Sequence, residues 1–333
     1  MRNQRVLLAS RPSGWVTEAN FSTEEAPLPQ PAQGEVLVRN LWLSLDPYMR
    51  GRMSDAKSYV KGVEIGEVMV GQTAGEVLES KHPTLKAGDK VLTQLGWQLY
   101  GTTKEAMRVD EKRAPLSAYL GVLGMPGMTA YFGLKEIGQP KAGETVVVSA
   151  ASGAVGSVVG QLARLWGCRA VGIAGGAKKC AYVKDELGLD ACIDYKAEKD
   201  LAAAVRAACP NGVDVYFDNV GGPVSDAVLA NLNFFARVAL CGSISQYNTA
   251  EPGPRWMGTF VGKRVTARGF IVWDFNQRYA PALQQMGEWV RTGRIKYKED
   301  IIAASIDTVP RTFIGLLRGE NFGKLQVKLG PDA

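Results

Sequence analysis

The sequence predicts an α/β protein in which a doubly wound parallel sheet is joined to a smaller β-rich domain. Three observations support this fold class. A glycine-rich turn joins a β-branched apolar run to an amphipathic segment just short of the middle of the chain. Apolar runs followed by small polar turns repeat after it, and this strand–helix alternation is typical of a parallel sheet. Short apolar runs separated by Pro and Gly come before it and indicate β-structure.

The glycine-rich turn has the form strand, tight turn, helix. Val146 to Val148 form a run too short for a helix and predict a buried parallel strand. Apolar residues recur at helical spacing from Val155 to Trp166, and Gly167 stands where that helix would end. A dinucleotide-binding turn carries G-x-G-x-x-G, whose glycines allow the tight turn, the approach of a pyrophosphate and the packing of helix on strand. The three positions here are Ala151, Gly153 and Gly156.

Because the first glycine is an alanine, this pattern is degenerate. The start of the helix still offers N–H groups and a positive dipole end to a phosphate. A glycine-rich turn of some other α/β protein remains the alternative.

The next strand, expected from Arg169 to Gly175, bears on the choice of cofactor. An NAD site needs an Asp or Glu near the end of this strand for the ribose 2′-hydroxyl. The sequence has small residues there, followed by Lys178 and Lys179. A carboxylate would repel a 2′-phosphate and an ammonium group would attract it, so we predict NADP(H) rather than NAD(H). Two solvated lysines at a helix start are the alternative.

Three further strands are expected, Ala191 to Tyr195, Val213 to Asn219 and Arg237 to Gly242. Ligands bind off the carboxyl ends of strands in a doubly wound sheet. The residues at or just beyond these ends are Tyr195, Asn219, Gly221, Gly242, Ser243, Ile244, Ser245 and Tyr247. Each alone is a common turn residue, and together they would surround one crevice.

The first part of the chain predicts a β-rich domain. Its expected strands include Val6 to Ala9, Glu35 to Ser44, Thr73 to Ser80 and Asp89 to Thr93. The segment from Asp46 to Gly71 contains Tyr48 and Tyr59 and is expected to be either a solvated loop or a wall of the substrate site.

Composition and residue counts exclude several function classes. The 333 residues are 46% apolar and 22% charged, and no apolar run is long enough to span a membrane, so we expect a cytoplasmic globular protein. The net charge of +6 is spread among acidic residues without a dense basic run, which argues against nucleic acid. His82 is the only histidine, and the five cysteines include no C-x-x-C. We therefore expect no metal site and no histidine-based catalysis.

One motif could indicate a short-chain dehydrogenase. Tyr195 and Lys199 form Y-x-x-x-K. In that class the glycine turn opens the chain and the Tyr-Lys pair follows on a later helix, whereas this tyrosine ends a strand of a domain that begins in mid-sequence. The placement argues against that class.

Six motifs in order along nearly the whole chain carry a resemblance to a known family. They are Leu45-Asp-Pro-Tyr-Met-Arg50, Gly124-Met-Pro-Gly-Met-Thr-Ala-Tyr131, Ala150-Ala-Ser-Gly-Ala-Val-Gly156, Phe217-Asp-Asn-Val-Gly-Gly222, Cys241-Gly-Ser-Ile-Ser-Gln-Tyr-Asn248 and Asn321-Phe-Gly-Lys324. The chain resembles the zinc-independent medium-chain reductases of the prostaglandin reductase, leukotriene hydroxydehydrogenase and alkenal reductase group, and is most similar to the bacterial curcumin reductase type. This resemblance implies a GroES-like domain from residues 1–125 and 305–333 and a Rossmann NADP(H) domain from 126–304, with the active site in the cleft between them.

The resemblance also implies roles for individual residues. Pyrophosphate contacts are expected from Gly153, Ala154, Val155 and Gly156, and the 2′-phosphate contact from Lys179. Adenosine and ribose contacts are expected from Tyr195 and Asn219. The nicotinamide side is expected to comprise Cys241, Gly242, Ser243, Ile244, Ser245, Tyr247, Phe270, Ile271, Val272 and Asn321. The run Gly176-Ala-Lys-Lys179 departs from the Ser-Asp-Glu-Lys pattern common in the family, which leaves open how Lys178 and Lys179 divide the phosphate.

The implied reaction is reduction of an α,β-unsaturated carbonyl compound by NADPH. The protein must then supply a hydrogen-bond donor to the developing enolate oxygen. Tyr247 is the first candidate and Tyr48 the second, because a tyrosine hydroxyl donates without ionising; the cofactor ribose hydroxyl is a third, and water could protonate the α-carbon. A quinone reductase and a non-catalytic nucleotide-binding protein remain alternatives. The expected sixth strand, Val265 to Val272, lies at the sheet edge, where the superfamily usually forms a homodimer.

Overall fold

The computed structural model describes residues 2–249 and 257–329. The chain divides into two compact units, one made of residues 1–121 and 299–333 and the other of residues 122–298. The domain limits expected from the sequence, at 125/126 and 304/305, lie a few residues from these divisions. We call the first unit the β-rich unit and the second the Rossmann unit.

The Rossmann unit is built on a parallel sheet. Its described strands run in the order β10-β9-β8-β11-β12-β13 and every neighbouring pair is parallel. Their bounds are β8 Thr145–Ser149, β9 Arg169–Ala174, β10 Ala191–Asp194, β11 Val213–Asp218, β12 Leu232–Leu240 and β13 Thr266–Gly269. The chain runs outward from β8 to β9 and β10, then returns to β11 on the other side of β8. The carboxyl ends of β8 and β11 therefore form the switch point at which doubly wound sheets bind ligands.

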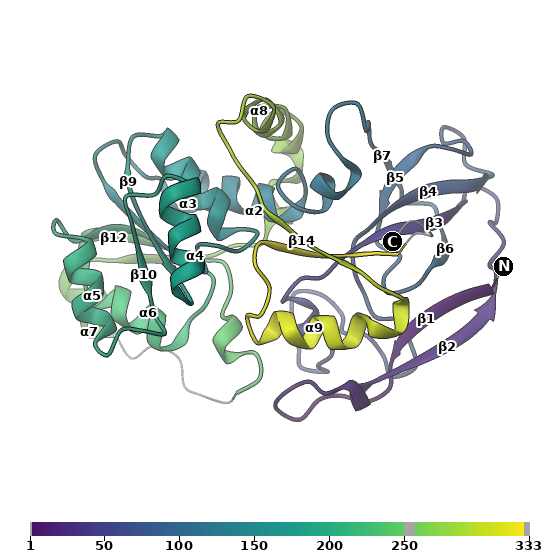
Figure 1. Cartoon of the computed structure of the whole chain (residues 1–333), viewed down its shortest axis with the longest axis horizontal. Helices are drawn as coiled ribbons and strands as arrows, with labels where there is room; N and C mark the ends of the chain where they lie inside the picture. The colour runs from purple at the N-terminus through teal and green to yellow at the C-terminus, as the bar shows by residue number, and fades with distance from the viewer. Residues whose placement is uncertain (1, 250–256, 330–333) are drawn as a thin grey trace. The chain divides into compact units, whose positions relative to one another are not determined.

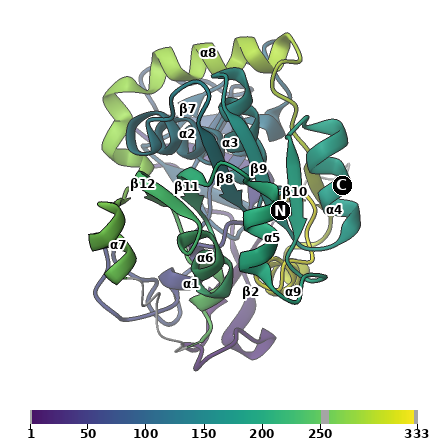
Figure 2. The same ribbon diagram turned by 90° about the vertical axis from the view of Figure 1, so that its left-hand side faces the viewer.

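Helices follow these strands as the alternation predicts (Figure 2). Their bounds are α2 Met125–Phe132, α3 Gly156–Leu165, α4 Ala177–Ala181, α5 Leu201–Ala208, α6 Gly222–Leu229, α7 Met257–Lys263 and α8 Tyr279–Arg291. One core joins Val147 and Ile193 of the sheet to Val205 of α5 and Val228 of α6. Because side chains alternate along a strand, Val146 and Val148 face the opposite side of the sheet, and both are fully buried.

The expected strands and the main helix agree closely with these bounds, with two differences at β12 and β13. β12 begins at Leu232, five residues before Arg237 where we expected it, and its pairing with β11 shifts register between Val213 and Val215. β13 ends at Gly269, so residues 270–272 lie beyond the strand. Gly167 has φ 79°, which is the left-handed helix end that the sequence predicts.

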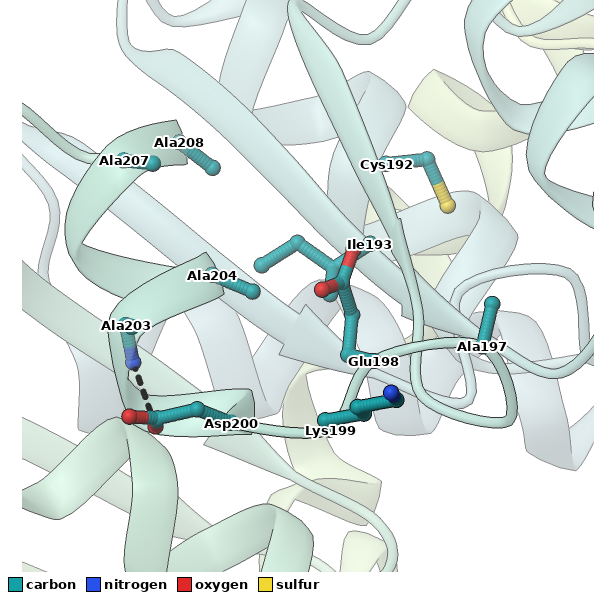
Figure 3. Close-up of a pocket in the computed structure, with 10 residues that line it drawn as sticks. All are labelled: Cys192, Ile193, Ala197, Glu198, Lys199, Asp200, Ala203, Ala204, Ala207 and Ala208. Carbon is teal, nitrogen blue, oxygen red and sulfur yellow. Dashed lines mark hydrogen bonds between the residues drawn. The ribbon is translucent and has the colours of Figure 1, made fainter.

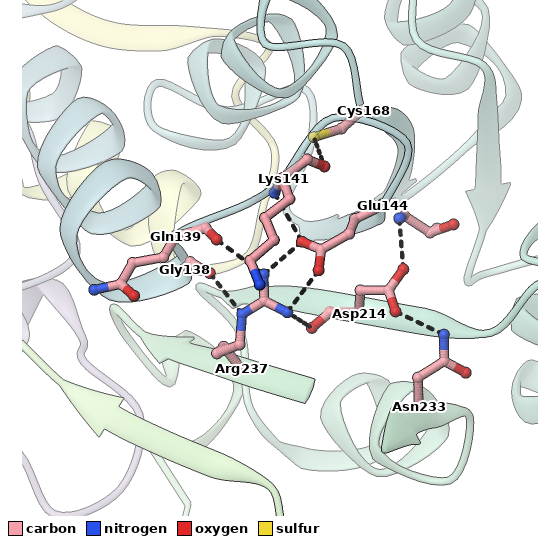
Figure 4. Close-up of polar contacts among 9 residues, drawn as sticks. Gly138, Gln139, Lys141, Glu144, Cys168, Asp214, Asn233 and Arg237 are labelled. Carbon is pink, nitrogen blue, oxygen red and sulfur yellow. Dashed lines mark hydrogen bonds and ion pairs between the residues drawn. The ribbon is translucent and has the colours of Figure 1, made fainter. Parts of the chain in front are cut away.

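An ion-pair cluster joins the amino-terminal ends of the central strands (Figure 4). The guanidinium group of Arg237 donates to the carbonyl oxygens of Gly138 at 3.1 Å and Gln139 at 2.9 Å, and forms an ion pair with Glu144. Asp214 accepts the Thr145 N–H at 2.8 Å. Burial raises the pKa of Glu144, but the hydrogen bond from Arg237 outweighs it and leaves the pKa below its ordinary value.

The β-rich unit contains a mixed sheet with the order β14-β15-β3-β4-β5-β7, with β6 paired to β3, and a separate β1-β2 hairpin (Figure 1). The strand bounds are β1 Arg2–Leu8, β2 Phe21–Pro27, β3 Val36–Ser44, β4 Thr73–Ser80, β5 Lys90–Thr93, β6 Tyr100–Thr103, β7 Met107–Arg108, β14 Glu299–Ala303 and β15 Lys324–Lys328. Its described helices are α1 Met49–Arg52 and α9 Val309–Leu317. The end of the chain thus contributes β15 to the same sheet as β3.

The segment from Asp46 to Gly71 is not a solvated loop throughout. Met49, Met53 and Met69 are fully buried in the core of the β-rich unit, together with Phe313 of α9. The sequence interpretation missed this because Met49 and Met53 each stand between polar residues.

Candidate active site

The turn after β8 presents unused N–H groups at the start of α3. Among the residues that the structure describes, the N–H groups of Ala154, Val155 and Gly156 have no hydrogen-bond acceptor, whereas Gly153 N–H donates to the Ala150 carbonyl oxygen at 2.9 Å. Three adjacent free donors at a helix start form a site for an anion such as a pyrophosphate.

The conformation of this turn explains why the alanine at the first position of the glycine pattern is compatible with the strand–turn–helix structure. The left-handed residue is Ala150, with φ 52°, while Ala151 has an ordinary negative φ, so a glycine is not required at position 151. The Ala151 methyl group fits because strand β9 has Gly172 opposite, where an added Cβ would lie 2.7 Å from it. Gly156 is required, since its Cβ would lie 2.3 Å from the Ala150 carbonyl oxygen.

The end of β9 carries small residues, Ala174 and then Gly175. An added Cβ at Gly175 would lie 2.8 Å from the ring of Tyr195, so this glycine lets the tyrosine pack over the backbone. Asp194 is the neighbouring carboxylate, and its Oδ1 accepts the Gly176 N–H at 2.7 Å and the Lys196 N–H at 3.1 Å. This carboxylate therefore holds the loop that leads into α4.

The two lysines of interest lie in the first turn of α4. Lys178 is exposed and Lys179 half-buried. Tyr195 is 44% exposed and offers a surface for an adenosine. Lys178 and Lys179 come from α4, whereas Tyr195 follows β10 and packs against Gly175 just beyond the end of β9.

Asn219, Gly242 and Tyr247 are brought together at the ends of β11 and β12. The Tyr247 hydroxyl accepts the Ser243 N–H at 3.4 Å, and an added Cβ at Gly242 would lie 3.1 Å from that hydroxyl and 3.3 Å from the Asn219 carbonyl oxygen. The tyrosine therefore folds back over its own turn, with its hydroxyl beside Asn219.

The other residues of this turn have separate surroundings. Ser245 is exposed and its hydroxyl donates to the Val220 carbonyl oxygen at 2.6 Å, while Ile244 is half-buried. Burial raises the pKa of the Cys241 thiol to about 12, so it stays protonated at neutral pH.

Residues 270–272, expected on the nicotinamide side, follow β13 and are partly or fully buried. The Phe270 ring is buried beside Phe217, at 6.0 Å between centroids, and Phe275, at 6.5 Å, so it is a core group of the Rossmann unit. Val272 is also buried and Ile271 half-buried. Any cofactor contact here would come mainly from the backbone.

Tyr48 and Asn321 belong to the β-rich unit. Tyr48 begins the turn into α1, and burial, followed by the charge of Asp46, raises the pKa of its hydroxyl. The Asn321 side-chain amide donates to the Gly323 carbonyl oxygen at 2.8 Å. Lys324 then makes a buried ion pair with Asp46 at 2.7 Å, which ties the last strand to the segment that carries Tyr48.

A pocket of about 690 Å³ lies between β10 and α5 (Figure 3). It is lined by Cys192, Ile193 and the alanines of α5, and none of the predicted site residues borders it. Asp200 at its edge already accepts the Ala203 N–H at 2.9 Å. We assign this pocket no role in the site.

Sequence reasoning missed two residues at the carboxyl end of the sheet, Ser149 and Asp218. Both are almost completely buried at the ends of β8 and β11. The signal was present, because a Ser and an Asp end two neighbouring central strands. His82, by contrast, accepts the N–H groups of Thr84 and Leu85 and serves its loop. The described residues contain no group of three or more His, Cys, Asp or Glu that could hold a metal.

Two protein families match the chain. Residues 4–110 match the family described as "N-terminal domain of oxidoreductase", and residues 154–288 match "Zinc-binding dehydrogenase". The chain is 48% identical to the NADPH-dependent curcumin reductase of Escherichia coli (strain K12), over 99% of this chain and 98% of that protein. It is 40% identical to the NADP(+)-dependent 2-alkenal reductase of Nicotiana tabacum, over 97% and 96%.

The crystal structure of CurA from Vibrio vulnificus in complex with NADPH is similar throughout. Its TM-score is 0.94 at 48% identity, with 98% of this chain and 99% of that chain covered. The chain therefore belongs to the medium-chain dehydrogenase/reductase family, within the zinc-independent reductase group.

Proposed function

We propose that this protein is an NADPH-dependent reductase of the carbon–carbon double bond of enones and enals. The observation that carries the proposal is the turn at α3 with three free N–H donors, in a chain 48% identical to an NADPH-dependent curcumin reductase. The chain acts on small molecules with NADPH as its cofactor.

The residues present fit this cofactor. The N–H groups of Ala154 to Gly156 would hold its pyrophosphate. Lys179, with Lys178 beside it, would hold the 2′-phosphate, because β9 ends in small residues and the nearby Asp194 carboxylate already accepts the Gly176 and Lys196 N–H groups. Tyr195 would cover the adenosine and Asn219 would contact the ribose. When bound, the cofactor supplies a hydride for the β-carbon of the substrate.

Negative charge then develops on the substrate carbonyl oxygen, and the protein must stabilise it. We assign this role to the Tyr247 hydroxyl, which lies beside Asn219 and Gly242 at the carboxyl end of the sheet. A neutral hydroxyl can donate a hydrogen bond to an enolate, and a preorganised donor of this kind contributes about 10²- to 10³-fold to kcat.

Tyr48 is the second candidate for the same role. The raised pKa of its hydroxyl keeps it protonated and able to donate. With His82 committed to its loop, water is the expected proton source for the α-carbon.

A steady-state assay tests this function. NADPH oxidation is measured with 3-nonen-2-one, and matched runs use NADH in place of NADPH and a quinone in place of the enone. Faster turnover with NADPH and the enone supports the proposal. A quinone that outcompetes the enone favours the quinone reductase alternative, and tight NADPH binding without turnover of either favours a non-catalytic protein.

We also propose that the protein is a cytoplasmic homodimer that binds no nucleic acid. The edge strand β13 is exposed along its length, and Phe234 and Phe235 of the neighbouring strand β12 and Val261 of α7 are more than 60% exposed. An exposed edge with apolar neighbours suits strand pairing with a second copy. No helix among the described residues is long and apolar enough to cross a membrane. Light scattering would give twice the chain mass for a dimer, and the chain mass would contradict it.

A further inference from the structure

A buried carboxylate lies at the switch point of the sheet and has no role in the function proposed above. Asp218 ends β11 and is 3% exposed. Its Oδ1 accepts hydrogen bonds from the Tyr216 hydroxyl at 2.8 Å, the Val220 N–H at 2.9 Å, the Gly221 N–H at 3.0 Å and the Ser149 hydroxyl at 3.2 Å. One oxygen thus gathers donors from β8, from β11 and from the turn after β11.

Ser149 carries this connection to Asn219. The Ser149 hydroxyl oxygen accepts the Asn219 backbone N–H at 2.8 Å, and the Ser149 carbonyl oxygen accepts the Asn219 side-chain amide at 2.8 Å. Asn219 is therefore fixed at both its backbone and its side chain. The residue after Ser149 is Ala150, whose left-handed φ of 52° is unfavourable for a non-glycine residue, so the same bonds help to hold a strained peptide.

The backbone of Asp218 extends the connection to β12. Its carbonyl oxygen accepts the N–H groups of Cys241 at 2.8 Å and Gly242 at 3.1 Å. Gly242 is the residue over which the Tyr247 hydroxyl lies. Two of the residues assigned to the nicotinamide side, Cys241 and Gly242, are therefore bonded to a single buried aspartate.

The charge of Asp218 fits this arrangement. Burying a carboxylate is costly unless hydrogen bonds compensate it, and four donors do so here. Burial, followed by the charge of Asp218, raises the pKa of Tyr216 well above its ordinary value, so this tyrosine remains a donor. A neutral amide at position 218 would lose the charge that strengthens the four hydrogen bonds to Oδ1.

We propose that Asp218 is a positioning residue for hydride transfer, acting through Ser149 and the backbone of residues 220 and 221 to hold Asn219 against the cofactor ribose and the Gly242 turn against the nicotinamide. This inference rests on the proposed function. The N–H groups of residues 154–156 lie further along the turn, which has its own bonds from Gly153 and Ser157. Loss of the Asp218 contacts is therefore expected to affect the hydride step more than cofactor affinity.

The test compares Asp218→Asn with a matched control on the same strand. Asp214 is near the amino-terminal end of β11, where its carboxylate also accepts hydrogen bonds, from the Thr145 N–H at 2.8 Å and the Asn233 amide at 2.8 Å. We expect Asp218→Asn to lower kcat by about tenfold or more, with less than about a threefold change in the Kd of NADPH. Asp214→Asn is expected to keep kcat within about twofold of the parent, because it changes a similar bond far from the crevice.

A second readout needs no turnover. The fluorescence enhancement of the reduced nicotinamide on binding reports its surroundings, and we expect it to change in Asp218→Asn and not in Asp214→Asn. Ser149→Ala provides a milder variant should Asp218→Asn fold poorly, with a smaller loss of kcat and the same change in fluorescence.

The outcomes separate the two proposals. A parent protein that does not reduce the enone contradicts the proposed function, while the fluorescence still tests Asp218. If the parent is active and Asp218→Asn has the same kcat and fluorescence as the parent, the positioning role is overturned. The same loss of kcat in Asp218→Asn and Asp214→Asn would also overturn it. Unchanged kcat and fluorescence in Ser149→Ala would do the same.

Discussion

Gly156→Ala is the change that most directly perturbs the phosphate turn. The new Cβ would lie 2.3 Å from the Ala150 carbonyl oxygen and 2.8 Å from its carbonyl carbon, whereas ordinary contacts begin at 3.4 Å. Both contacts are to backbone, so the start of α3 must move by about 1 Å relative to the turn in a closely packed site. That movement misaligns the N–H groups of Ala154 to Gly156. A hydrogen bond to a charged group contributes about 1.5–3 kcal/mol, so losing one lowers NADPH affinity roughly ten- to a hundredfold.

Gly160→Ala is the matched control, because it makes the same substitution on the same helix. Its Cβ would lie 2.5 Å from a methyl group at the flexible end of the Leu189 side chain, away from the turn. We expect a change in Tm and an unaltered Kd for NADPH. Fluorescence titration with NADPH measures both variants. Gly156→Ala binding within about twofold of the parent would refute the assignment of this turn to the pyrophosphate.

Three further outcomes are expected. Lys179→Ala raises the KM for NADPH by about tenfold while leaving that for NADH unchanged, because only NADPH carries the 2′-phosphate; an unchanged ratio of the two would exclude Lys179 from this contact. Tyr247→Phe lowers kcat by about 10²-fold with little effect on NADPH affinity, and equal turnover of variant and parent would remove Tyr247 from the mechanism. The pKa of Glu144 is lower in the folded protein than in the unfolded chain. Its carboxylate therefore stabilises the fold at pH values above the unfolded-state pKa, and this stabilisation is lost as the pH falls through the folded-state pKa. Chemical denaturation from pH 7 to pH 3 should therefore show a smaller acid loss for Glu144→Gln, and parallel curves would contradict this.

The strands and the main helix of the Rossmann unit could be predicted from sequence because their signals are local. Val146 to Val148 are β-branched and buried, and Gly167 ends α3 in the conformation that only glycine adopts readily. The longer β12 was missed, because a register shift opposite Val213 to Val215 depends on pairing with β11 and not on local pattern.

The candidate site could be predicted only as a set of strand ends. Asp218 was missed because its role arises from donors that come from β8, β11 and the following turn, which meet only in the folded sheet. Phe270 is expected to line the nicotinamide side, and the structure shows that its ring packs with Phe217 and Phe275 in the core of the Rossmann unit. A residue's position in a motif indicated the right segment without indicating which way its side chain points.

The measurement that tests the central claim most directly follows the hydride itself. NADPH deuterated at C4 of the dihydropyridine ring is incubated with the protein and 3-nonen-2-one, and the product is examined by mass spectrometry and NMR. The account predicts 2-nonanone carrying one deuterium at C4, the former β-carbon. Deuterium on the carbonyl carbon of an allylic alcohol, or unlabelled enone recovered while NADPH binds tightly, would contradict it.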